Sequence, residues 1–396
     1  MLDPRRVRAE TGRETGHGTG YGSGYDVVVV GGGVVGLSVA WRTARRGLSV
    51  AVVDPAPGGG ATHVSAGMLA PVSEVTYTEE PLLRLGLASL AGWPSFRAEL
   101  EDESGAALDY RTDGTLDIAY GADDMAYLDE LAAFEKTLGL RVERLTGREC
   151  RAFEPMLSPS VRGGLLARDD AWVNPRRVLR ALLTSFEKAG GTLLPGRVTA
   201  LDADSDGDAD GDRPGGVRLA SGEVVRATSV VVAAGSWSPS LLPGLPVRPI
   251  KGQILRLRGP EGFLTRCVRG LVHGSPAYLV PRGDGEITVG ATVEELGFDG
   301  RVTAGGVYEL LRDARELVPG ITELALTETA VGFRPGTPDN LPLIGPAGSP
   351  GVFAATGHHR AGVLLAPITA EAVVAFLTGG EVPDVVKSCD PGRFSR

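Results

Sequence analysis

The chain is poor in cysteine. Its 396 residues include only three, Cys150, Cys267 and Cys389, which lie far apart along the sequence. This spacing allows neither a Cys-x-x-Cys metal site nor the disulfide framework of a small secreted domain. We therefore expect the protein to work in a reducing compartment.

Long apolar segments are absent as well. No stretch reaches the roughly 18 apolar residues of a membrane-spanning helix, and the first residues lack the apolar core of a signal peptide. The net charge of -9 and the pI near 5.3 argue against a basic surface for a nucleic acid. We expect a cytoplasmic protein that binds neither a membrane nor a nucleic acid.

Motifs for two common kinds of catalysis are also missing. The adjacent His358 and His359, together with His273, do not have the spacing of a metal site. The chain also has no Gly-x-Ser-x-Gly segment that would present a serine nucleophile. We therefore expect no bound metal ion and no acyl-enzyme chemistry.

Glycine, in contrast, is abundant. The 57 glycines are close to twice the usual share of about 7%, and they follow no collagen-like period. Glycine in this amount suits turns and close approaches of the backbone to a ligand. The 42% hydrophobic content supports a packed core, and at about 150 residues per domain the length predicts two or three domains.

Hydrophobic patterning predicts a βαβ unit at the start of the folded part: a strand at 26–30, a glycine turn, a helix at 36–46 and a strand at 48–53. The other expected helices are 81–104, 123–139, 175–188, 305–317 and 363–377; the other expected strands are 115–119, 197–201, 217–219, 224–226, 229–233 and 352–355, with more strands in 247–300. This order fits an α/β fold in which a substrate domain is inserted into a discontinuous nucleotide-binding domain.

Two segments are expected to lie outside these elements. Residues 1–24 are rich in Gly, Arg and Thr without periodicity, so we expect a flexible, disordered tail. The Asp-rich segment 202–216 begins like a calcium-binding loop. It has Arg213 or Val217 where the loop needs a bidentate Glu, so we expect a solvated hairpin loop.

The strongest motif follows the first predicted strand. Gly31, Gly33 and Gly36 form Gly-x-Gly-x-x-Gly at the head of a predicted helix, and Asp54 ends the next strand 18 residues after Gly36. In this context the glycines let the backbone approach a pyrophosphate, the helix N-terminus meets its charge, and Asp54 accepts from ribose hydroxyls. A carboxylate there disfavours a 2′-phosphate, so the motif predicts FAD or NAD.

Three further segments favour FAD over NAD. Residues 230–235 are an apolar strand that ends in Ala-Ala-Gly, as in flavoproteins with a second glycine-ended strand. Thr62 and the small residues of 65–69 suit backbone packed against a flat ring. Residues 356–362 form a turn before the helix expected near Val363, whose positive end would stabilise the negative charge of a reduced flavin.

With these pieces in order, the chain resembles the D-amino acid oxidase superfamily of FAD-dependent oxidoreductases, and within it the glycine oxidase branch that serves thiamine biosynthesis. The matching segments are Gly31 to Gly36 with Asp54, 65–69 (Ser-Ala-Gly-Met-Leu), 251–253, 278–282, 289–292, 332–337 (Gly-Phe-Arg-Pro-Gly-Thr) and 357–360. They extend over nearly the whole predicted folded region.

The resemblance implies a Rossmann-like FAD-binding domain and a substrate domain whose antiparallel sheet covers the flavin. We expect the FAD-binding domain to comprise 25–75, 148–246 and 325–396, and the substrate-binding domain to comprise 76–147 and 247–324.

The resemblance also assigns the site. Arg334 would bind the substrate carboxylate, and Tyr278 and Arg360 would be the other substrate-binding residues. The residues expected to bind FAD are Gly31, Gly33, Val34, Val35, Gly36, Asp54, Pro55, Thr62, His63, Gly67, Met68, Leu69, Val198, His358, His359, Arg360, Ala361, Gly362, Val363 and Leu364. Lys251 is expected to be a solvated lysine outside the site.

Some positions depart from the family pattern. Asp54 stands where many members have Glu, which keeps the acceptor. Residues 330–334 contain no cysteine at the region through which sarcosine oxidases attach their flavin, so we expect noncovalent FAD. Residues 275–277 match no family residue clearly, which leaves the size of the substrate side chain open.

The implied activity is oxidation of glycine, sarcosine and small D-amino acids to the imine by hydride transfer to flavin N5, with glyoxylate, ammonia and hydrogen peroxide as products. Dioxygen would reoxidise the flavin, and the imine would pass to thiazole synthase. A homo-oligomer, by resemblance a tetramer, is expected. The alternatives are a flavin-dependent D-amino acid or secondary-amine dehydrogenase that passes electrons to a quinone or carrier, and a nucleotide-binding module without redox activity.

Overall fold

The computed structural model describes residues 24–203, 214–272 and 274–394. Apart from Gly24, the expected tail at 1–24 lies outside the described residues, and so does most of the expected loop at 202–216. The helices are α1 (Val34–Ala44), α2 (Ala61–Val64), α3 (Glu80–Ser104), α4 (Ala122–Thr137), α5 (Gly147–Phe153), α6 (Pro175–Lys188), α7 (Ala304–Leu317) and α8 (Ala366–Thr378).

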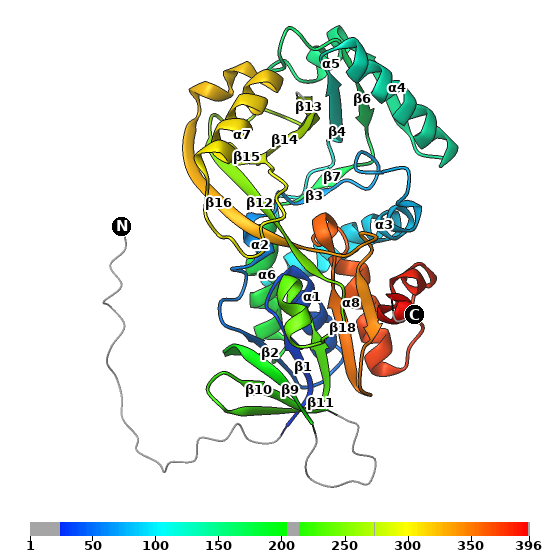
Figure 1. Ribbon diagram of the computed structural model, residues 1–396, viewed down its shortest axis with the longest axis vertical. Helices are drawn as coiled ribbons and strands as arrows, with labels where there is room; N and C mark the ends of the chain where they lie inside the picture. Colours follow the sequence, from blue (N-terminus) through cyan, green and yellow to red (C-terminus); the bar gives the residue numbers. More distant parts are fainter. Residues whose placement is uncertain (1–23, 204–213, 273, 395–396) are drawn as a thin grey trace, which may run out of the picture.

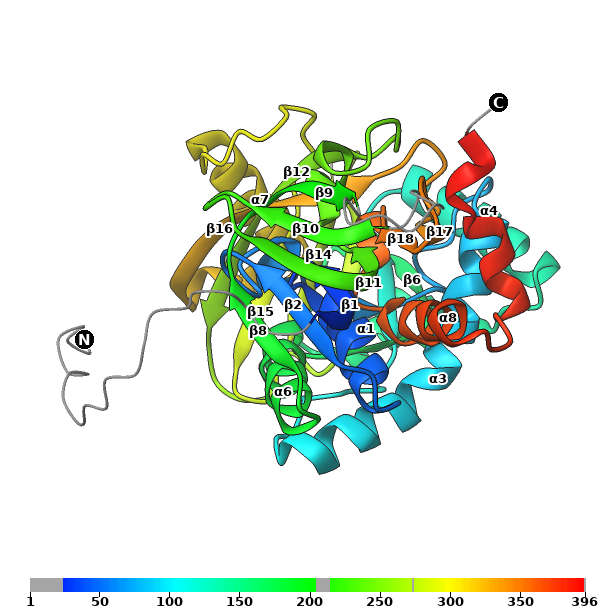
Figure 2. The ribbon, with the colours of Figure 1, turned by 90° about the horizontal axis from the view of Figure 1, so that it is seen from below.

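The lower half of the molecule is built on a mainly parallel sheet (Figure 1). Its strands, in spatial order, are β17 (Leu343–Pro346), β18 (Val352–Thr356), β11 (Val224–Val232), β1 (Tyr25–Val30), β2 (Val50–Asp54) and β8 (Thr192–Pro195). β1 is a run of valines buried on both faces, as the central strand of a covered parallel sheet requires. Figure 2 shows α1, α6 and α8 on one side of this sheet and the hairpin β9 (Val198–Ala203) and β10 (Pro214–Leu219) on the other.

The upper half is built on a second sheet of eight strands. In spatial order these are β16 (Ala325–Gly336), β12 (Arg248–Arg258), β15 (Glu286–Gly290), β14 (Ser275–Pro281), β13 (Cys267–Val272), β4 (Thr115–Ala119), β6 (Gly163–Ala167) and β5 (Val142–Thr146). All neighbouring pairs are antiparallel except β13 and β4. Helix α7 packs on the face of this sheet that carries Leu116 and Ile118, whereas α4 packs on the opposite face, against Ala119 and Leu165. A short ladder of β3 (Met68–Leu69) and β7 (Ala171–Trp172) lies between the two sheets.

The structure confirms the expected α/β class with a Rossmann-like unit. Most predicted helices begin and end within two residues of the observed ones, and α6 starts at the Asn174 cap, whose side chain accepts from the N–H groups of Arg176 and Arg177. Two expectations are wrong. The strands expected at 224–226 and 229–233 are one strand, β11, and the helix expected at 363 begins at Ala366, after a short 3-10 turn at His359–Ala361.

Sheet membership differs from the expected domain segments at two strands. β6 and β16 both pair within the second sheet, although 148–246 and 325–396 were expected to belong to the FAD-binding domain. β16 belongs to the second sheet because its twelve residues pair with nearly the full length of β12. Within the described residues, no helix is both long enough and apolar enough to cross a membrane.

Candidate active site

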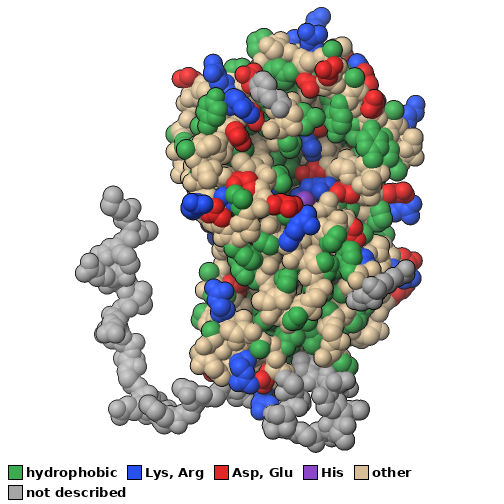
Figure 3. Space-filling view, viewed as in Figure 1, with side chains coloured by type: hydrophobic (Ala, Val, Ile, Leu, Met, Phe, Trp, Pro, Cys, Tyr) green, Lys and Arg blue, Asp and Glu red, His purple; other side chains and the backbone are tan. Residues whose placement is uncertain are grey.

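A cleft of about 830 Å³ lies between the two sheets. Figure 3 shows it as a hollow near the middle of the molecule, with basic, acidic and histidine side chains around its mouth. Its walls come from segments far apart in sequence: the turn after β1, the end of β2, residues 60–68, the cleft face of the second sheet, and the turn after β18. Ligand sites of this size are common at such crevices.

The glycine turn between β1 and α1 forms one end of the cleft. Gly31 has a φ of +113°, which favours glycine. A Cβ there would overlap the carbonyl of Ala233, the residue directly after the neighbouring strand β11. A Cβ on Gly36 would overlap the carbonyl of Gly31. The turn can therefore form only with glycine at these two positions, and it brings the start of α1 against the cleft.

Asp54 lies at the end of β2, beside this turn. Its Oδ2 accepts the N–H of Gly32 at 2.6 Å and its Oδ1 accepts the N–H of Ala56 at 2.7 Å. Each carboxylate oxygen can accept a second hydrogen bond, and the residue lines the cleft. Thr62 accepts the N–H of Val34 at 3.1 Å and so holds residues 60–64 against the start of α1.

Two histidines follow β18 on the floor of the cleft. His358 is buried, and its Nε2 lies 2.9 Å from the hydroxyl of Thr369. Burial lowers the pKa of His358 to about 3. Burial and then the charges of Arg360 and Arg334 lower the pKa of His359 to about 4, so both rings are neutral at pH 7.

His359 carries an unsatisfied polar atom at the cleft. Its Nδ1 is buried without a hydrogen-bond partner, and the residue has a φ of +46°, which is uncommon for a residue with a side chain. Buried polar atoms normally have partners. A flavin in the cleft would offer polar ring atoms there, so the residues present fit this cofactor.

Arg334 extends from β16 into the cleft. Its Nη1 donates to the carbonyl of Thr292 at 3.2 Å, and no carboxylate among the described residues is paired with it. Gly252 on the neighbouring strand leaves the space that the guanidinium fills, because a Cβ there would overlap it. Most of the five N–H donors of Arg334 are therefore free to bind a ligand.

Tyr278 lies beside Arg334. Its ring covers Gly290 on the adjacent strand, where a Cβ would overlap the phenol oxygen. Burial raises the pKa of the Tyr278 phenol above its usual value, against the charge of Arg334 and a hydrogen bond with that guanidinium. The phenol thus stays protonated and can donate a hydrogen bond within the cleft.

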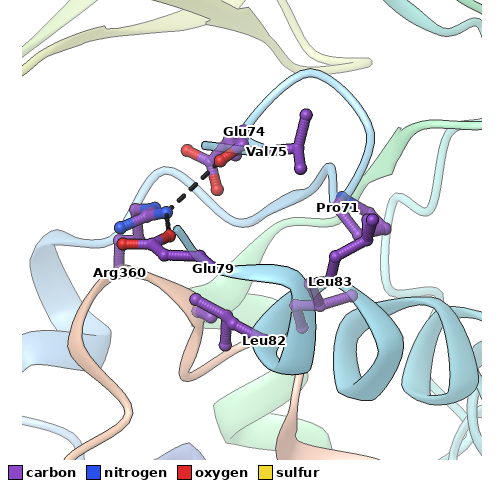
Figure 4. Close-up of a pocket in the computed structure, with 9 residues that line it drawn as sticks. Pro71, Glu74, Val75, Glu79, Leu82, Leu83 and Arg360 are labelled. Carbon is purple, nitrogen blue, oxygen red and sulfur yellow. Dashed lines mark hydrogen bonds and ion pairs between the residues drawn. The ribbon is translucent and has the colours of Figure 1, made fainter. Parts of the chain in front are cut away.

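Arg360 differs from Arg334 because its charge is already paired. It forms an ion pair with Glu79, at the start of α3, and donates to the carbonyl of Glu74 at 3.3 Å (Figure 4). Burial alone would raise the pKa of the Glu79 carboxyl, but the hydrogen bond and charge of Arg360 hold it below its usual value. Arg360 lines the large cleft as well as the small pocket drawn in Figure 4.

Most of the residues expected to bind FAD or substrate line the large cleft. They are Gly31, Gly33, Val34, Val35, Asp54, Pro55, Thr62, Gly67, Met68, Val198, Tyr278, Arg334, His358, His359, Arg360, Gly362 and Val363. The cleft lining does not include Gly36, His63, Leu69, Ala361 or Leu364.

These five residues have other surroundings. Gly36 packs beneath the glycine turn, and Leu69 is fully buried in the core. The carbonyl of His63 accepts from Arg176 and Arg256. Ala361 and Leu364 line the small pocket, and the carbonyl of Leu364 accepts from Ser89 and Trp93.

Lys251 is not solvated, so this expectation is wrong. Its side chain is fully buried and its Nζ lies 3.1 Å from a carboxylate oxygen of Glu294. The position belongs to β12, which is covered on both sides. The acidic partner comes from the loop after β15, which local sequence could not place.

Several cleft residues were not expected from the sequence, among them Glu74, Trp237, Arg269 and Val293. Only Arg269 carried a signal, as a charged residue within the apolar strand β13. None of the three cysteines lines the cleft. Among the described residues, no group of three or more His, Cys, Asp or Glu side chains is placed to hold a metal ion.

Comparisons with known proteins agree with this site. The sequence model of the DAO family, described as FAD dependent oxidoreductase, matches residues 26–376. The chain is 33% identical over 380 residues to the bifunctional protein ThiO/ThiG of Trichormus variabilis, covering 94% of this chain and 55% of the relative. It is 32% identical over 351 residues to the glycine oxidase of Geobacillus kaustophilus, covering 87% of this chain and 90% of that enzyme.

The crystal structure of the glycine oxidase from Geobacillus kaustophilus matches the model with a TM-score of 0.85 at 31% identity, covering 93% of this chain and 98% of that chain. The chain spans about half the length of the ThiO/ThiG relatives. The glycine turn, the adjacent carboxylate and the match over most of the chain lead to one conclusion: the chain belongs to the DAO family of FAD-dependent oxidoreductases, and its cofactor is FAD.

Proposed function

We propose that the protein oxidises glycine, and also sarcosine and small D-amino acids, with noncovalently bound FAD. The products would be glyoxylate, ammonia and hydrogen peroxide, formed from glycine, dioxygen and water. The names of the relatives support an amino acid as substrate, since one is a glycine oxidase and another carries ThiO.

The observation that carries this proposal is the guanidinium of Arg334. It reaches the cleft from β16, and its partners among the described residues are a backbone carbonyl and the Tyr278 phenol, with no carboxylate. A carboxylate can accept two parallel hydrogen bonds from such a group, each contributing about 1.5–3 kcal/mol. The anchor fixes the orientation of a small amino acid, which is the main requirement on the protein.

When bound, FAD supplies the acceptor for the hydride that leaves the substrate carbon. The residues of the chain bind the substrate and orient it. In this proposal the Tyr278 phenol would donate a further hydrogen bond to the carboxylate held by Arg334. The neutral rings of His358 and His359 add no charge to the floor of the cleft.

The proposal includes transfer of the imine product to thiazole synthase. The relatives that join ThiO to ThiG in one chain support it, because fusion keeps two successive activities together. We also propose that the protein assembles as a homo-oligomer, by family resemblance a tetramer, which light scattering of the purified protein would measure.

The test is an anaerobic absorbance spectrum of the purified holoenzyme, mixed in turn with glycine, sarcosine, D-alanine and L-alanine, and then exposed to air with peroxide detection. We expect glycine to bleach the flavin, and air to restore the colour with formation of peroxide. L-alanine is the control and should leave the spectrum unchanged.

The other outcomes separate the alternatives. Bleaching by an amine without rapid peroxide formation in air would identify a dehydrogenase that uses a quinone or carrier. A flavin that no amine bleaches would contradict amine oxidation altogether.

A further inference from the structure

Three polar side chains lie side by side on the cleft face of the second sheet. Asp117 in β4 is directly opposite Arg269 in β13, and Arg269 is directly opposite Tyr278 in β14. Residues directly opposite on neighbouring strands point to the same face, with Cβ atoms about 5 Å apart. Arg269 and Tyr278 both line the large cleft.

The row continues to Arg334. Gly290 and Gly252 have no side chains, so the Tyr278 ring lies over the first and the Arg334 guanidinium over the second. Tyr278 and Arg334 consequently meet. Arg269 is therefore one side chain away from the residue proposed to hold the substrate carboxylate.

The guanidinium of Arg269 is only partly satisfied. Its Nε lies 3.2 Å from Oδ2 of Asp117, whereas its Nη1 is buried and has no hydrogen-bond partner. An unpaired buried donor costs about 1–3 kcal/mol. Arg269 also lines the cleft, so a ligand there can supply a further acceptor to its guanidinium.

The positive charge of Arg269 is more than balanced by two nearby carboxylates, those of Asp117 and Glu74. Burial lowers the pKa of Arg269, but the negative charges of Asp117 and then Glu74 outweigh it and hold the pKa above its usual value. Glu74 also lines the cleft, and its carboxylate makes no hydrogen bond to any side chain among the described residues. This end of the cleft thus offers one donor and one acceptor rather than a net positive charge.

We propose that Arg269 and Glu74 form a second substrate subsite that binds a carboxamide. The carbonyl oxygen would accept from the guanidinium of Arg269, and the NH₂ group would donate to Glu74. The inference rests on the proposed function, in which Arg334 holds the α-carboxylate. It extends the substrate class from glycine to small D-amino acids that end in a carboxamide, such as D-asparagine.

The test measures binding without turnover. Succinamate, 4-methylpentanoate and succinate each carry a carboxylate for Arg334 and no oxidisable amine; at the far end they carry a carboxamide, an apolar group of similar shape and a second carboxylate. Each is titrated into the holoenzyme, and the change in the FAD spectrum gives its Kd. We expect succinamate to bind about tenfold more tightly than either of the other two.

Variants assign the preference to Arg269. Arg269→Met should remove it, whereas Arg258→Met should keep it, because Arg258 is an exposed arginine of the same sheet that does not line the cleft. Arg269→Met leaves Asp117 unpaired, so the double variant Asp117→Asn with Arg269→Met is measured as well. It should also lack the preference.

Three results would overturn the subsite: equal binding of succinamate and 4-methylpentanoate, tighter binding of succinate than succinamate, or a preference that survives in the double variant. These results are separate from the proposed function. Failure of glycine to bleach the flavin would contradict the oxidase and leave the binding ratios unaffected, whereas equal binding in a protein that oxidises glycine would contradict only the subsite.

Discussion

The two ends of the cleft are built by different means. At the cofactor end, the shape of the site is set mainly by the backbone. Glycines permit the turn after β1, buried valines form the strands, and Asp54 is held by two N–H groups. At the substrate end, charged side chains stand on the face of a sheet, and several are only partly paired. The first end is defined by steric constraints, and the second by electrostatic ones.

The two ends should therefore respond differently to amino-acid substitutions and to pH. The cofactor end should fail when a single methyl group is added and should be insensitive to pH. The substrate end should tolerate changes of shape better, but it should respond to removal of a charge and to protonation. The following predictions test this contrast, from the largest effect to the smallest.

The largest effect is expected at the glycine turn. In Gly36→Ala the new Cβ would overlap the carbonyl of Gly31, so the turn must shift away from the cofactor. We expect the purified protein to lose its bound FAD, measured as the ratio of flavin to protein absorbance. Gly92→Ala is the control, because Gly92 lies in α3 with open space around it. Full FAD content in Gly36→Ala would contradict the steric account.

A large effect on catalysis, without loss of FAD, is expected at Arg334. Arg334→Met removes the free guanidinium and should lower kcat/KM for glycine by roughly a hundredfold or more. The FAD content should match that of the unchanged protein and of the Arg258→Met control. Near-normal kcat/KM would contradict the role of Arg334 as carboxylate anchor.

A smaller effect is expected at Arg360, although it lines the same cleft. The Arg360 guanidinium is already paired with Glu79, so Arg360→Met should lower kcat/KM for glycine by less than about tenfold. The same variant should lower the melting temperature, because the partly buried Glu79 loses its charged partner and keeps the hydrogen bond from Asn340. Steady-state kinetics and thermal melts measured together separate the two effects. A loss of kcat/KM as large as that of Arg334→Met would show that both arginines bind substrate.

The smallest effect concerns pH. Burial, followed by the charges of Asp117 and Asp170, raises the pKa of Glu135 in α4 from 4.5 to about 7, while Arg269 opposes the shift. A raised pKa in the folded state means that Glu135 stabilises the fold most below pH 4.5 and that this contribution is lost as pH rises through about 7. We expect the melting temperature to fall between pH 5 and pH 8.

Glu135→Gln should flatten this dependence, because the amide resembles the protonated acid. Glu130→Gln, at an exposed position of the same helix, is the control and should keep the slope. A slope that is unchanged in Glu135→Gln would mean that other groups, such as Asp170, whose pKa is raised to about 6, account for the pH dependence.

The sequence was informative where the determinants are local. The Gly-x-Gly-x-x-Gly turn, the Asn174 cap and the valine strands involve neighbours within a few residues, and each was found in place. The helix after β18 was placed three residues early, because periodicity does not distinguish an irregular turn at 359–365 from the helix that follows it. The family resemblance added Arg334 and Tyr278, which no local pattern marks.

Lys251 shows why the remainder could not be predicted. A lysine next to glycine on a strand has the pattern of a solvated residue, yet Glu294 covers it from a loop 43 residues further along the chain. Arg269 is similar, since its partner Asp117 is on a strand that precedes it by about 150 residues. Pairing of this kind depends on strand order, which sequence patterns do not encode.

The family, the cofactor and the position of the glycine turn can be inferred from the amino-acid sequence alone, because steric limits on the backbone act over short distances. Which charges are free depends on the tertiary structure. Arg334 and Arg360 are alike in sequence as arginines two residues from a glycine, but only Arg360 is paired with a carboxylate. The two arginines differ because ion pairs form only between side chains that are close in space. These side chains become close only after the two sheets have folded against each other.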